Sequence, residues 1–174
     1  IGETMSGIIG GAGSKSGIIG GIMPWAYLYR TGDQTFATGD YAQMVWQGIK
    51  GHGSISANDG WNIPKTGWYR VSIVVNAHTT SDNITDRRVK LSQGTSADAE
   101  ETWKWSAYTS QGGSPCPNRH VDVTGNAIIY LNAGKVLFAW AYMVGSGTVV
   151  AFASDANVNS TGMHVNFLGT TNYH

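Results

Sequence analysis

From Pro24 onward the chain is a succession of short strand-like runs separated by turn residues. The runs are Trp25–Arg30, Tyr41–Gln47, Trp68–Asn76, Arg88–Ser92, Ala127–Leu131, Val136–Val144, Thr148–Ala153 and Met163–Leu168. Turn-forming residues such as Asn58-Asp59-Gly60 and Asn132-Ala133-Gly134 stand between them. The best helical candidate, Ala97–Trp105, is so short that it reads as one turn within a loop. This pattern predicts an all-β fold, either an antiparallel sandwich or a barrel.

The first 23 residues differ from the rest and are predicted to form a separate segment. The sequence SGIIGG occurs at Ser6–Gly11 and again at Ser16–Gly21. Glycine at this density disfavours a helix, whereas the isoleucine pairs are too apolar for a linker that stays in water. We therefore expect residues 1–23 to be a connector or arm that packs on a neighbouring subunit, with a terminus lacking fixed structure as the alternative. Residues 24–174 form the predicted domain.

Composition excludes several classes of partner. Eleven Lys and Arg balance eleven Asp and Glu, so no long-range field attracts nucleic acid or an anionic membrane. No run is long enough and apolar enough to insert as a membrane helix. Charged residues make up only 13% of the chain, about half the usual share. Such a surface suits an extracellular or particle-bound protein, or one partly hidden against other subunits.

One predicted strand, Val136–Val144, is apolar on both faces. Alternation places Phe138, Trp140 and Tyr142 on one face, and leucine, alanine and methionine side chains on the other. Only one face of a strand meets the core of an antiparallel sandwich, so the second face needs another cover. We predict that a symmetric copy supplies it, which makes Phe138, Trp140 and Tyr142 candidate oligomer-interface residues. The alternative is that the N-terminal arm or a loop of the same chain folds over this face.

Three segments resemble the C1q and tumour-necrosis-factor (TNF) family. The run Asn62–Val71 is similar to that family's proline, glycine and aromatic core strand, and Ile129–Val136 to its leucine, glycine, polar residue and valine. Lys135 stands where an aspartate is usual, and Met163–Leu168 sits where the family has its closing central strand. The resemblance spans about 25–170. It implies a ten-strand jelly roll that forms a homotrimer through the faces of its central strands, in an extracellular or virion setting.

The glycine-rich repeat and the low charge look most like the copies of this fold in phage tail-fibre or tail-tip proteins. Within the implied trimer, His164 on the closing strand would face the axis, where three copies could bind a metal or sense acid. A hydrogen-bonded interior histidine is the more ordinary reading. Because of its position in the implied trimer, His164 is kept as a candidate interface residue. No metal site is predicted.

The sequence yields no catalytic constellation, so we predict no enzymatic activity and no cofactor. Cys116 and His120 are close in sequence but lack the further groups that a nucleophilic pair or a zinc site needs. Asp155, Asn157 and Asn159 alternate like calcium ligands, yet the glycine and glutamate of a calcium loop are missing, which favours an ordinary polar turn.

The predicted ligand site lies in the long segment Thr95–His120. Trp103, Trp105, Tyr108 and Asn118 are the candidate ligand-binding residues. Trp103 and Trp105 would share a face of an extended strand, and flat aromatic rings beside amides suit sugars. The alternative is that these tryptophans cover the sandwich edge or fill a subunit interface.

Together these features predict a non-enzymatic, homotrimeric structural and binding module of a phage tail or similar surface appendage. Its expected partners are other appendage proteins, through the N-terminal segment, and a host-surface polysaccharide or protein. The alternative is a secreted C1q/TNF-like head for recognition or signalling.

Overall fold

The computed structural model describes residues 23–79, 84–95, 103–110, 121–145, 149–151 and 161–171, and its secondary structure there is entirely β. The strands are β1 (Trp25–Tyr29), β2 (Gln34–Phe36), β3 (Tyr41–Gln43), β4 (Gly48–Gly51), β5 (Trp61–Asn62), β6 (Gly67–Thr79), β7 (Ile84–Gly94), β8 (Trp103–Ser110), β9 (Val121–Leu131), β10 (Val136–Gly145), β11 (Val149–Ala151) and β12 (Gly162–Gly169). No helix that could cross a membrane occurs in these ranges.

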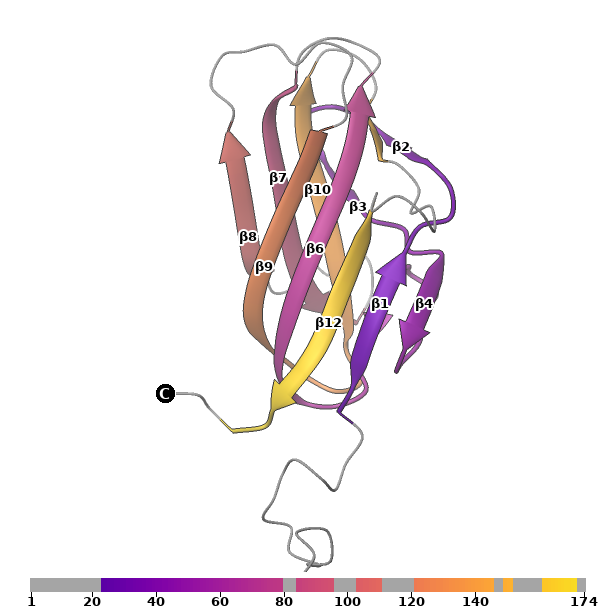
Figure 1. Ribbon diagram of the computed structural model, residues 1–174, viewed down its shortest axis with the longest axis vertical. Coiled ribbons are helices and arrows are strands. Elements are labelled where there is room, and N and C mark those ends of the chain that lie inside the picture. Colours follow the sequence, from indigo (N-terminus) through magenta and orange to yellow (C-terminus); the bar gives the residue numbers. More distant parts are fainter. Residues whose placement is uncertain are drawn as a thin grey trace, which may run out of the picture.

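The strands form two antiparallel sheets that face each other (Figure 1). Sheet A has seven strands in the order β2-β11-β6-β12-β1-β4, and β9 pairs with the other edge of β6. Sheet B has five strands in the order β3-β10-β7-β8, and β5 pairs with one end of β10. The start of β1 and the end of β12 lie at the same lower end of sheet A in Figure 1. The prediction of an antiparallel β-sandwich is confirmed.

Strict alternation in the long strand β6 shows how the sequence builds this core. Tyr69, Val71, Ile73 and Val75 are all buried between the sheets, whereas the residues between them point outward, as a half-buried strand requires. The Tyr69 hydroxyl donates a hydrogen bond of 2.6 Å to the Lys65 carbonyl oxygen. Burial raises the pKa of Tyr69 to about 12, so this phenol stays neutral and acts as a structural donor.

All eight predicted runs overlap strands of the structure, but four strands were not predicted. The short strands β2, β4 and β5 carry too few residues for a period to show. β8 was expected to be a loop containing one helical turn, and that expectation was wrong for residues 103–110, which pair with β7 along their length. Long-range pairing, which local pattern does not encode, decides the structure of this segment.

The hairpin between β4 and β5 closes against the outer side of sheet B. The Ser56 hydroxyl accepts hydrogen bonds from the backbone N–H groups of Asn58 and Gly60, at 3.2 and 3.1 Å. Gly60 lies so close to β10 that an added Cβ would stand 2.7 Å from Phe138 Cδ1 and would also contact Val136 Cγ1. A glycine is therefore required for this hairpin to reach β10.

We expect Gly60→Ala to lower the free energy of unfolding by about 1–3 kcal/mol, because the added methyl overpacks the contact with β10. Gly32→Ala is the matched control, since its Cβ would lie 3.7 Å from the nearest atom, Gln47 Oε1, in ordinary van der Waals contact. That control is expected to change stability by less than about 0.5 kcal/mol. Chemical denaturation of both variants measures the difference, and equal stabilities would contradict the close contact.

Candidate functional site

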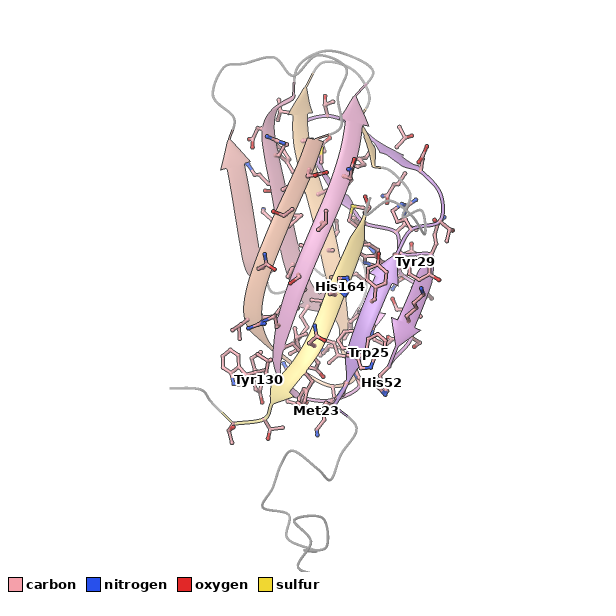
Figure 2. All side chains as sticks on the ribbon, viewed as in Figure 1. Met23, Trp25, Tyr29, His52, Tyr130 and His164 are labelled. Atoms are coloured by element: carbon pink, nitrogen blue, oxygen red, sulfur yellow. The ribbon has the colours of Figure 1, made fainter. Side chains whose placement is uncertain are left out.

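Exposed apolar side chains gather on the outer face of sheet A. Among the residues that the structure describes, the exposed large hydrophobic side chains are Met23, Trp25, Ile128 and Tyr130, at 46%, 45%, 57% and 38% exposure. Trp25 begins β1, Met23 lies two residues before it, and Ile128 and Tyr130 lie on β9. Figure 2 shows Met23, Trp25 and Tyr130 at the same end of the sheet. Several exposed apolar side chains at one end of a sheet face are typical of an interaction surface.

Strand register joins these positions into rows that cross the sheet. One row consists of Trp25, Asn166, Arg70 and Ile128, contributed by β1, β12, β6 and β9 in turn. The next row consists of Tyr27, His164, Ser72 and Asn126. Residues paired across neighbouring strands share a face, so both rows point away from the core. These two rows, with Tyr29, Trp68 and Tyr130, make up what we call the outer face of sheet A.

Ring contacts organise one side of this face. Tyr27 stacks on His164 with ring centroids 4.2 Å apart and an interplanar angle of 21°. Tyr27 also stacks on Tyr29, at 5.7 Å and 25°. Gly162 makes room for the Tyr27 ring, because a Cβ there would lie 2.7 Å from Tyr27 Cε2. At the sheet edge, Trp25 meets the His52 ring edge-on at 6.1 Å, and the Trp25 backbone N–H donates to His52 Nδ1 at 3.4 Å. The aromatic rings are thus held in fixed positions.

A shallow groove of about 400 Å³ lies on the other side of this face, between β6 and β9. Its lining residues are Arg70, Ser72, Asn126, Ala127 and Ile128. The Ser72 hydroxyl donates to Asn126 Oδ1 at 2.6 Å. A molecule bound in the groove would thus contact the Arg70 guanidinium, the Asn126 amide and the aliphatic side chain of Ile128.

The second face of β10 is covered largely by the chain itself. Phe138 is completely buried, with Gly60 beside it and Ser92 registered opposite. The Trp140 indole N–H donates to the Ser92 hydroxyl at 2.8 Å. The expectation that this face needs a symmetric copy is therefore wrong at Phe138, because a loop of the same chain covers it. This outcome is the alternative that sequence analysis left open.

Tyr142, the third predicted interface residue on β10, is half-buried and also has partners within the chain. Its ring lies 4.9 Å from the Tyr41 ring, and the Arg88 guanidinium lies 4.9 Å from its centroid. Asp86 accepts a 2.6 Å hydrogen bond from Arg88 Nη2, and this contact raises the pKa of Arg88. Cations and rings of neighbouring strands thus cover part of this aromatic side chain.

His164 is exposed on the outer face of sheet A, so the expectation of an interior hydrogen-bonded histidine is wrong. Its position on a central strand agrees with the sequence-based placement, and its outward direction agrees with the alternative that the C1q/TNF resemblance implied. The stacked Tyr27 ring covers one side of the imidazole, and this partial burial lowers the pKa of His164 below its ordinary value.

The predicted ligand-binding tryptophans lie on β8, which pairs with β7. Trp105 is registered opposite Leu91 and Trp103 opposite Ser92, with a register shift between the two pairs. The ligand-binding role of these residues stays a prediction. Tyr108 is registered opposite Arg88.

Several predicted features lie outside the described residues. They are the segment 1–22, the pair Cys116 and His120, the candidate ligand residue Asn118, and the calcium-like run containing Asp155, Asn157 and Asn159. Within the described ranges, no three His, Cys, Asp or Glu side chains come together in a way that could hold a metal ion. The prediction that the chain is not an enzyme is not tested by this observation.

Sequence reasoning missed the outer face of sheet A as the main exposed apolar surface. The signal was present in WAYLY at the start of the domain, where Trp25, Tyr27 and Tyr29 alternate with the buried Ala26 and Leu28. Like β10, this strand is apolar on both faces. Unlike β10, its second face is left uncovered at Trp25.

Comparisons with known proteins identify the fold. No protein-family model matches the chain, and no curated protein matches its sequence. Among solved structures, the chain is similar to Eiger, a TNF from S. frugiperda, with a TM-score of 0.63 and 12% sequence identity. The match covers 87% of this chain and 96% of Eiger. At this identity the likeness establishes the fold alone, and the chain therefore has a TNF-like jelly-roll fold.

Proposed function

We propose that this protein is a non-enzymatic binding and structural module that assembles as a homotrimer through the outer face of sheet A. The observation that supports this most directly is that Trp25, Ile128 and Tyr130, all exposed, lie at one end of a single sheet face, on either side of Asn166 and Arg70. Burying such side chains against copies of the same surface stabilises an assembly by about 25 cal/mol for each Å² of apolar area removed from water.

The proposed contact surface replaces most of the one expected from sequence. Trp25, Tyr27, Ile128 and Tyr130 enter it, and His164 remains in it. Trp140 and Tyr142 on β10 already have hydrogen-bond or ring partners within the chain. The second face of β10 is therefore a weaker candidate for the contact between subunits. The C1q/TNF resemblance implies three copies. Three-fold symmetry would place the same residues of this face, one set from each subunit, around a common axis.

Two settings outside the cell fit such a module. The low charge supports a surface appendage such as a phage tail, where the trimer would contact a host-surface polysaccharide or protein with avidity from three copies. The similarity to a TNF supports a secreted recognition or signalling head instead. Recovery of the native protein on assembled particles would favour the first setting, and its recovery as a free secreted protein would favour the second.

We expect light scattering on the purified chain to give a mass near three times its 18.6 kDa at micromolar concentration. The apolar area on the outer face of sheet A is the physical reason, since a monomer would leave it in water. Non-specific aggregation would instead give a broad distribution of masses that changes with dilution, so the measurement is repeated at lower protein concentration as a control. A clean monomer or dimer at micromolar concentration would contradict the proposal.

A further inference from the structure

His164 occupies the middle of the surface through which we propose that copies meet. It lies on β12, which stands between β6 and β1 in sheet A. Its imidazole stacks on Tyr27 at 4.2 Å, and Ser72 is registered opposite it on β6. Figure 2 shows His164 in the central part of the face, away from the end that holds Trp25 and Tyr130. Any copy that covers the two rows described above must also cover this imidazole.

Cations rather than acids surround this position. Arg70 on β6 is registered opposite Asn166, the next outward-facing residue of β12. Lys50 on β4 is registered opposite Tyr27, and its Nζ lies 5.8 Å from the Tyr29 ring centroid. A positively charged imidazole would therefore meet two further positive charges on the same face.

The described carboxylates lie at a distance from His164. Asp122 on β9 is registered opposite Asn76, four residues beyond Ser72 along β6, which is about 13 Å at the usual rise of a strand. Asp33, in the turn after β1, acts on the Arg30 guanidinium. Within the described part of the chain, no carboxylate is thus placed to neutralise a protonated His164.

We propose that His164 makes the assembly acid-labile: the neutral imidazole fits between subunits, and its protonation drives them apart. This inference rests on the proposed function, because it requires that copies meet through the outer face of sheet A. The stacked Tyr27 ring favours the imidazolium slightly. That contact exists in the single chain and in the assembly alike, so it does not oppose the switch.

The direction follows from which state binds the proton more weakly. Partial burial already lowers the pKa of His164 in the single chain from its ordinary 6.5. Covering the ring with a second subunit removes more water and lowers that pKa further. The assembled state then binds fewer protons than separate subunits, so assembly is complete at higher pH and is lost as the pH falls through the lowered pKa of His164 in the separate subunits. Three histidines act together, so the association constant can fall by up to about 1000-fold per pH unit.

The test is the mass of the full chain by light scattering, stepped from about pH 7.5 to about pH 5, with circular dichroism at each step. We expect the wild-type protein to pass from trimer to folded monomer across this range. His164→Phe keeps a ring over Tyr27 but cannot take up a proton, so this variant should stay trimeric at the acid end. His164→Lys carries a permanent charge and should be monomeric throughout.

His52→Gln is the matched control, since His52 lies at the edge of the face beside Trp25. It should leave the midpoint of dissociation within about 0.3 pH units of the wild-type value. A wild-type trimer that persists at the acid end overturns the inference while leaving the proposed function intact. Loss of the pH response in His52→Gln, or acid unfolding at the same midpoint, also overturns it. A wild-type monomer at about pH 7.5 would instead refute the proposed function itself.

Discussion

Replacing Ile128 with Asp is expected to convert the trimer into a stable, folded monomer. Ile128 is 57% exposed on β9, the most exposed large hydrophobic side chain in the described part of the molecule. In a single chain an aspartate there stays in water and costs little. In the proposed assembly each carboxylate would be buried beside Arg70, its partner in register on β6, and taking an added charge out of water costs several kcal/mol even where a cation is close. The mass from light scattering should fall from three chains to one.

The folded state of this variant provides its own check. Because Ile128 points away from the core, the monomer should keep the circular dichroism spectrum of the folded protein. Its unfolding transition should also stay cooperative. Ala133→Asp is the matched control, since it places the same charge at an exposed position in the turn between β9 and β10. That control should remain trimeric. A trimeric Ile128→Asp variant would mean that β9 lies outside the contact surface.

Local period in the sequence predicted β6 because this strand follows strict alternation, whereas β7 and β9 were predicted only in part. In β6 the buried residues recur at every second position, so the face toward the core could be assigned before any pairing was known. On β12 the same rule separated His164 from its buried neighbours Met163 and Val165, but it could not decide that His164 faces outward. These are properties of one strand at a time.

Properties that depend on two distant segments were not predictable in this way. Gly60 gives no sign in the sequence that it lies against Phe138, which is far away along the chain. The register shift in the pairing of β7 with β8 is likewise a feature of the pair of strands. The apolar residues on both faces of β10 therefore correctly indicated that its second face needs cover. They could not indicate whether a loop or a second chain supplies that cover.

Phe138→Ala decides between those two sources of cover. Phe138 is completely buried by its own chain, so truncation should leave a cavity and lower the free energy of unfolding by about 3–5 kcal/mol. If Phe138 were an interface residue, its loss would weaken assembly and leave the single chain nearly unaffected. The two cases differ most clearly in a protein that does not assemble.

The measurement is therefore made in the Ile128→Asp background, where unfolding involves one chain and does not depend on protein concentration. Urea denaturation of Ile128→Asp with and without Phe138→Ala should show the full loss. Tyr142→Ala is the control on the same face, since Tyr142 is only half-buried between Tyr41 and Arg88. It should cost about 1–2 kcal/mol, from its ring contacts and partial burial. A loss at Phe138 no larger than at Tyr142 would show that the hairpin containing Gly60 does not seal this face in solution, and would return the second face of β10 to the contact surface.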